Sequence, residues 1–91
     1  MSKGISTKFA HSILLSNFRS TKLVLVLEPW AEYFDILPDD KIEVTGHGPK
    51  DGVLDVAIRD DEVSVAAWRG GTLVVRRNGV VLGGPRDAPW R

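Results

Sequence analysis

Three tryptophans and five of the arginines are the residues best suited to recognising a partner. They are Trp30, Trp68, Trp90, Arg69, Arg76, Arg77, Arg86 and Arg91. Large aromatic rings and guanidinium groups are enriched at the hot spots of protein interfaces. After residue 58 every basic residue is an arginine, six of them against four acidic residues. This part of the chain could therefore also form a local surface that faces an anion.

Trp68 is the tryptophan that strand alternation places on a polar face. It shares its side of the expected strand with Ser64 and Ala66, because side chains alternate between the two faces of a strand. A ring exposed there, beside a guanidinium and a Gly-Gly turn, has little role in folding alone. The residues expected to bind a ligand or partner are Trp68, Arg69, Trp30 and Glu32. In the alternative interpretation, both rings complete a small core.

Residues that could support catalysis or hold a metal are few. A metal site needs several convergent histidine, cysteine or carboxylate ligands. The chain offers only His11 and His47, with Glu28 and Glu32 as possible oxygen ligands. The pairs Asp39-Asp40 and Asp60-Asp61 favour turns, because adjacent side chains on an extended chain point in opposite directions. No serine stands in a Gly-x-Ser-x-Gly context. We therefore expect no cofactor, no metal and no catalytic residues.

The overall charge gives no long-range attraction to a charged partner, so partners must be recognised locally. Twelve basic and twelve acidic residues give the chain no net charge at pH 7, so no overall field draws it to nucleic acid or to an anionic membrane. No apolar run reaches membrane-spanning length, and the amino terminus lacks the apolar core of a signal peptide. The chain contains no cysteine, which fits a reducing compartment. The expected location is the cytoplasm.

The stretch from Leu23 to Leu27 (Leu-Val-Leu-Val-Leu) predicts a buried strand with apolar side chains on both faces. Pro29 ends this strand, because proline lacks the amide donor of a ladder hydrogen bond. A chain of 91 residues has little other mass to cover a second apolar face. The sequence therefore predicts self-association, most simply as a homodimer. The alternative cover is the apolar segment from Phe9 to Phe18.

Short alternating runs and turn sequences fill the chain from Lys22 to Leu82. Asn78-Gly79 is the strongest turn signal, since a type I′ turn needs positive φ at both central residues. About seven short strands leave no room for crossover helices, so the predicted fold is all-β, a small antiparallel β-sandwich or partly open barrel. Three parts are expected: an N-terminal arm with a short apolar segment (1–21), the all-β domain (22–82) and a flexible tail (83–91). The residues expected to supply most of the core are Leu23, Leu25, Leu27, Phe34, Ile36, Ile42, Val44, Leu54, Val56, Ile58, Val63, Val65, Leu73 and Val75.

One part of the sequence resembles a known group of proteins. The run Leu-Val-Leu-Glu-Pro-Trp-Ala-Glu at residues 25–32, followed by Leu-Pro-Asp-Asp at 37–40, resembles the Leu-Glu-Pro-Trp signature of small, functionally uncharacterised bacterial β proteins. This resemblance implies an all-β fold and no particular activity. The rhythm of strand, Leu-Pro turn and strand is also similar to that of cupins and cupredoxins. Their clustered histidine, cysteine and methionine ligands are absent here, so their activities do not carry over.

Three function classes remain open from the sequence. The class that requires the fewest specialised residues is a non-enzymatic binding or assembly module, whose partner is a second copy, another protein or a small molecule. The second class is a small β-barrel ligand-binding or metal-binding protein, or a metal-dependent enzyme. The third is a nucleic-acid binder, which would need more excess positive charge or a stacking platform.

Overall fold

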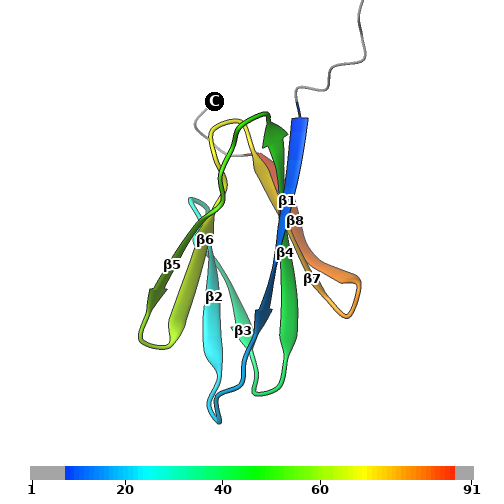
Figure 1. Cartoon of the computed structure of the whole chain (residues 1–91). Helices are drawn as coiled ribbons and strands as arrows, with labels where there is room; N and C mark the ends of the chain where they lie inside the picture. Colours follow the sequence, from blue (N-terminus) through cyan, green and yellow to red (C-terminus); the bar gives the residue numbers. More distant parts are fainter. Residues whose placement is uncertain (1–7, 88–91) are drawn as a thin grey trace, which may run out of the picture.

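The computed structural model describes residues 8–87, and the regular structure in this part of the chain is entirely β-strand (Figure 1). The eight strands are β1 (Lys8–Ser16), β2 (Leu23–Glu28), β3 (Glu32–Ile36), β4 (Lys41–Pro49), β5 (Asp55–Arg59), β6 (Glu62–Ala66), β7 (Thr72–Arg77) and β8 (Val80–Asp87). Residues 8–87 contain no apolar helix of membrane-spanning length. The prediction of an all-β fold is confirmed.

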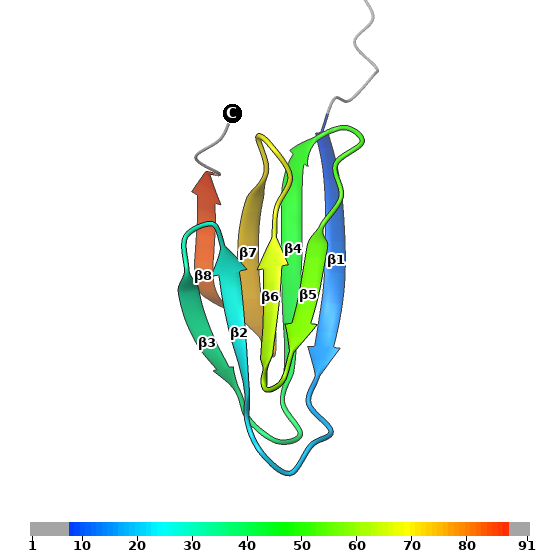
Figure 2. The same ribbon diagram turned by 90° about the vertical axis from the view of Figure 1, so that its left-hand side faces the viewer.

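The strands form two four-stranded sheets that face each other as a sandwich (Figures 1 and 2). Sheet A has the order β1-β4-β7-β8, and sheet B has the order β3-β2-β6-β5. All neighbouring strands are antiparallel except β2 and β6, which run parallel with Val26 opposite Ser64. This parallel pair arises because the chain leaves sheet B after β3, adds β4 to sheet A, and returns to sheet B as β5 and β6.

The hydrophobic core lies between the two sheets and follows the period of two expected of strands that have one face buried. Sheet B contributes the inward set of β2 and β6, and sheet A contributes alternate residues of β4 and β7. The buried members of this cluster are Leu25, Leu27, Ile36, Ile42, Val44, Val63, Val65, Ala67, Leu73 and Val75. Three further predicted core residues, Leu23, Phe34 and Leu54, are partly buried against it.

Val56 and Ile58 depart from the predicted core. Both are paired with buried residues of β6, Val65 and Val63, so they face inward as expected. Yet the two side chains are 40% and 77% exposed. The reason is that β5 is an edge strand of sheet B, and Figure 1 shows it splayed away from the opposite sheet.

The outer face of β2 also differs from the prediction. Val26 points away from the core but is only 2% exposed, although Figure 1 shows no described segment packed over this face of sheet B. Its neighbours in the sheet are Tyr33 on β3 and Ser64 on β6. Side chains on the same face therefore cover Val26, and the two-sided apolar run needs no second molecule to bury it.

The regular structure extends beyond the predicted 22–82 at both ends. The apolar segment of the predicted N-terminal arm contributes to β1, where Ile13 and Leu15 pack on the core beside Val44 and Ile42 of β4. At the other end, β8 continues through the glycines and Pro85 of the predicted tail to Asp87. Proline is tolerated there because β8 is the edge of sheet A. Residues 1–7 and 88–91, including Trp90 and Arg91, lie outside the described part.

Turn chemistry follows the sequence closely. Asn78 and Gly79 have φ of 52° and 79°, which confirms the predicted turn with positive φ at both centres. The turn at Leu37 to Asp40 is closed by a hydrogen bond of 2.9 Å from the Asp40 amide to the Leu37 carbonyl. Asp39 has a φ of 67°, the conformation that the third residue of a type II turn requires.

Asn17 joins two loops at the end of the sandwich opposite the β2–β3 turn. Its side chain is 1% exposed, and its amide donates to the carbonyl oxygens of Thr21 (2.9 Å) and Ile36 (2.8 Å). Its side-chain oxygen accepts a hydrogen bond of 2.9 Å from the Arg19 amide. A single buried side chain therefore satisfies backbone groups of both the β1–β2 loop and the end of β3.

Candidate functional site

Trp68 lies just beyond β6 at one end of the sandwich, where its ring packs against sheet A. The indole Nε1 donates a hydrogen bond of 2.8 Å to the Pro49 carbonyl oxygen. The ring forms a T-shaped contact with the His11 ring at a centroid distance of 5.4 Å and an interplanar angle of 74°, a geometry that aromatic rings favour. The indole is thus fixed by a polar contact and by ring packing.

Three glycines form a cradle for this ring. A Cβ on Gly52 would lie 1.9 to 2.0 Å from three ring atoms of Trp68. A Cβ on Gly46 or Gly48 would come within 2.9 Å or 3.0 Å of the ring. Side chains at these positions would collide with the indole, so the glycines and the tryptophan form one packing unit.

The ring is therefore half-buried in the end of the sandwich. Alternation predicts instead that it is displayed on the outer face of sheet B, and this prediction is wrong. Alternation fails because β6 ends at Ala66. The chain then turns towards sheet A, with a hydrogen bond of 2.8 Å from the Gly71 amide to the Trp68 carbonyl. The periodicity of a strand does not extend into such a turn.

The other predicted site residues lie at the same end of the molecule. The parallel pairing of β2 and β6 sets Glu28 opposite Ala66, so the segments after both strands emerge together. Trp30 is half-buried against the core in the β2–β3 turn, and Glu32 is the half-buried first residue of β3. Arg69 is exposed. The structure thus brings the predicted residues to one end of the sandwich. The rings of Trp30 and Trp68 are, however, partly buried against other residues of the sandwich.

Two shallow depressions mark the surface elsewhere. One, of about 260 Å³, lies over the outer face of sheet A and is lined by Leu14, Lys41, Glu43, Arg76, Asn78 and Gly79. The other, of about 340 Å³, lies beside β3 and is lined by Phe34, Asp35, Leu37, Arg77 and Leu82. Arg77 is held there by a hydrogen bond to the Asp35 carbonyl (2.7 Å) and an ion pair with Asp40 (3.0 Å). Within residues 8–87, no group of three or more histidine, cysteine or acidic side chains could hold a metal ion.

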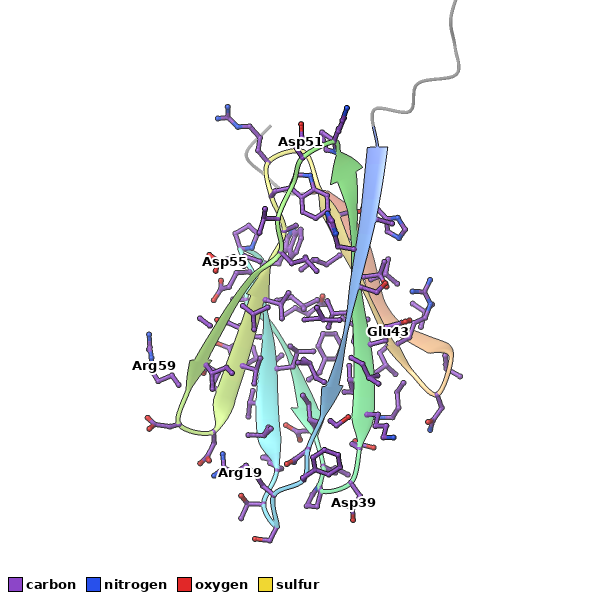
Figure 3. All side chains as sticks on the ribbon, in the orientation of Figure 1. Arg19, Asp39, Glu43, Asp51, Asp55 and Arg59 are labelled. Atoms are coloured by element: carbon purple, nitrogen blue, oxygen red, sulfur yellow. The ribbon has the colours of Figure 1, made fainter. Side chains whose placement is uncertain are left out.

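The free edge of β5 combines exposed apolar side chains with two exposed charged side chains. Val56 and Ile58 lie on the inner side of this strand, and all five of its residues are exposed. Asp55 and Arg59 are on its other side, and Figure 3 shows both pointing away from the body of the sandwich. Neither forms an ion pair with another residue of the described part. This edge can therefore bind an extended segment both through backbone groups and through side chains.

No protein-family model matches the sequence, and no similar protein was found among curated proteins or solved structures. The resemblance to small bacterial β proteins stays a prediction.

The sequence contained a signal for the β5 edge that periodicity alone does not reveal. The strand reads Asp-Val-Ala-Ile-Arg from Asp55 to Arg59, so opposite charges stand at equal distances on either side of Ala57, with a β-branched residue between each charge and the alanine. Such a segment is complementary to itself when two copies run antiparallel. Alternation indicated only that Val56 and Ile58 face inward.

Proposed function

We propose that the protein is a small non-enzymatic assembly module that associates with itself as a homodimer. The observation that carries this proposal is the exposure of Val56 and Ile58, 40% and 77%, on the core-facing side of an edge strand. These two apolar side chains face the core, but the described part of the chain leaves them exposed. Covering them with a second molecule removes apolar area from water, which favours association.

The position of β5 strengthens the argument. An open edge presents a row of backbone donors and acceptors that can pair with another strand. The exposed Val53 lies just before β5 and lengthens the apolar edge. Since the outer face of β2 is already covered by its neighbours, the edge of β5 supports self-association better than the face that the sequence indicated.

A second candidate surface is the end of the sandwich that carries Trp68, Arg69, Trp30 and Glu32. The parallel register of β2 and β6 supports it, because this register gathers the four residues at one end. Another protein or a small molecule is the partner proposed for this surface, with the exposed Arg69 as its charged contact. The proposed location is the cytoplasm, since a chain without cysteine fits a reducing compartment.

Sedimentation equilibrium of the full chain tests the proposed homodimer. An edge-strand interface is small, and small interfaces are weak, so we expect the mean mass to rise from monomer towards dimer between roughly 10 and 500 µM. A static light-scattering series over the same range checks the result. A monomer mass across the whole range would contradict the proposal.

A further inference from the structure

We infer that the dimer forms by antiparallel pairing of β5 with β5 of a second copy, about a two-fold axis at Ala57. This inference rests on the proposed homodimer and identifies its interface. The pairing would join the two copies of sheet B into one continuous sheet of eight strands, four from each copy. Each copy would offer the other the same five residues, as a two-fold symmetric interface requires.

The backbone of β5 is set for this pairing. Arg59 and Glu62 face each other across the two-residue turn Asp60-Asp61, and the pair that closes such a hairpin exchanges both of its hydrogen bonds. Because hydrogen-bonded pairs alternate along an antiparallel ladder, Asp55, Ala57 and Arg59 direct their backbone groups at β6. Val56 and Ile58 therefore direct their amides and carbonyls away from the hairpin, where a new strand can accept and donate.

A two-fold axis at Ala57 satisfies those outward groups. It places Val56 of each copy opposite Ile58 of the other copy, which makes two hydrogen-bonded pairs. Both residues are β-branched and both lie on the inner side of the strand, so four apolar side chains meet in one cluster. Cross-strand pairs of this kind stabilise a sheet. The exposed flank of each core would thus be covered by that of the other copy.

The charges select this register. With the axis at Ala57, Asp55 lies opposite Arg59 of the second copy, and the two-fold axis repeats the contact. These positions are the non-hydrogen-bonded ones, where side chains of antiparallel strands approach most closely. An axis at Ile58 would instead set Asp55 opposite Asp61 of the second copy, and an axis at Val56 would leave both Asp55 and Arg59 without an opposite charge. Charge complementarity of this sort favours one arrangement over its alternatives.

Charge reversal at the two positions tests the register. In D55R the two copies place arginine opposite arginine, and in R59D they place aspartate opposite aspartate, twice in each dimer. We expect each single variant to raise the dissociation constant of the dimer by about tenfold or more, because like charges directly opposite each other destabilise a pair of strands. The double variant D55R/R59D restores opposite charges and should dimerise like the original chain. A mixture of D55R and R59D should form a heterodimer, although neither variant pairs well with itself.

Two further variants separate pairing from folding. Ile58→Pro removes an amide that points away from β6, so it should abolish dimerisation while the hairpin keeps its internal hydrogen bonds. Lys50→Glu reverses an exposed charge in the β4–β5 connection and should leave the dissociation constant unchanged. D55R is the cleaner of the charge variants, since Asp55 faces the uncharged Ala66 within its own hairpin, whereas Arg59 faces Glu62. Far-ultraviolet circular dichroism of each variant verifies that the sandwich is intact.

The outcomes distinguish the interface from the function. Loss of the dimer in both single variants, with recovery in the double variant and in the mixture, supports the β5 register. A dimer that tolerates both reversals and Ile58→Pro would show that self-association uses another surface, which overturns this inference and leaves the assembly proposal standing. A chain that is monomeric throughout would overturn both.

Discussion

Replacing Trp68 with alanine is expected to lower the free energy of unfolding by about 3 kcal/mol, at the lower end of the range for deleting a packed aromatic side chain. The ring occupies a cradle of glycines that have no side chains to fill the space it leaves. Its removal also leaves the Pro49 carbonyl without the indole donor at 2.8 Å. Urea unfolding followed by circular dichroism measures the change, since tryptophan fluorescence would itself be altered by the substitution.

Two control variants make this result interpretable. Arg69→Ala changes the exposed neighbour and should alter stability by less than about 0.5 kcal/mol. Trp68→Phe keeps most of the ring but loses the hydrogen bond to Pro49, so its cost should be about 1 kcal/mol. If Trp68→Ala left the stability unchanged, the ring would not be structural, and the binding surface predicted from the sequence would become the better interpretation of it.

Replacing Asn17 with aspartate is expected to lower the free energy of unfolding by about 3 kcal/mol or more, because a buried carboxylate would face two carbonyl oxygens. In the native protein the amide of Asn17 donates to both, at 2.9 and 2.8 Å. Asn17→Ala removes the donors without adding charge and should cost about 2 kcal/mol. Both costs can be measured by urea unfolding.

Ser20→Ala is the matched control, since Ser20 is exposed in the same loop and its loss should change stability by less than about 0.5 kcal/mol. Equal stabilities for Asn17→Asp and Asn17→Ala would mean that the carboxylate oxygen facing the Thr21 and Ile36 carbonyls acquires a proton or a donor, contrary to the hydrogen-bond pattern described above.

Much of the fold could be predicted because its strongest signals are local. The apolar alternation of β4 and β6 and the Asn78-Gly79 turn each depend on a few consecutive residues. They predict strands, faces and reversals whatever the rest of the chain does. The predicted β-sandwich follows from those signals and from the absence of room for crossover helices.

The features that local signals did not predict depend on distant partners. Nothing in the sequence of β2 indicates that its second neighbour in the sheet is β6, or that β6 runs parallel to it. Val56 and Ile58 have the pattern of core residues, but only the order of strands in sheet B reveals that they lie at its edge. Alternation places Trp68 on the wrong side of its strand because the strand ends two residues before it. Asn17 carries no periodic signal, and its importance follows from the two loops that happen to meet around it.

The parallel pairing of β2 with β6 also determines how the molecule can come apart. Each sheet contains strands from both halves of the chain, and Val26 and Ser64, which sit side by side, are roughly 40 positions apart along it. No cut through a loop would yield two pieces that each hold a complete sheet. We therefore expect unfolding to be a single all-or-none transition, with circular dichroism and tryptophan fluorescence giving the same midpoint. A fragment that ended before β6 would leave the edge of β2 open, and this apolar strand would then be the part of the chain most prone to aggregate.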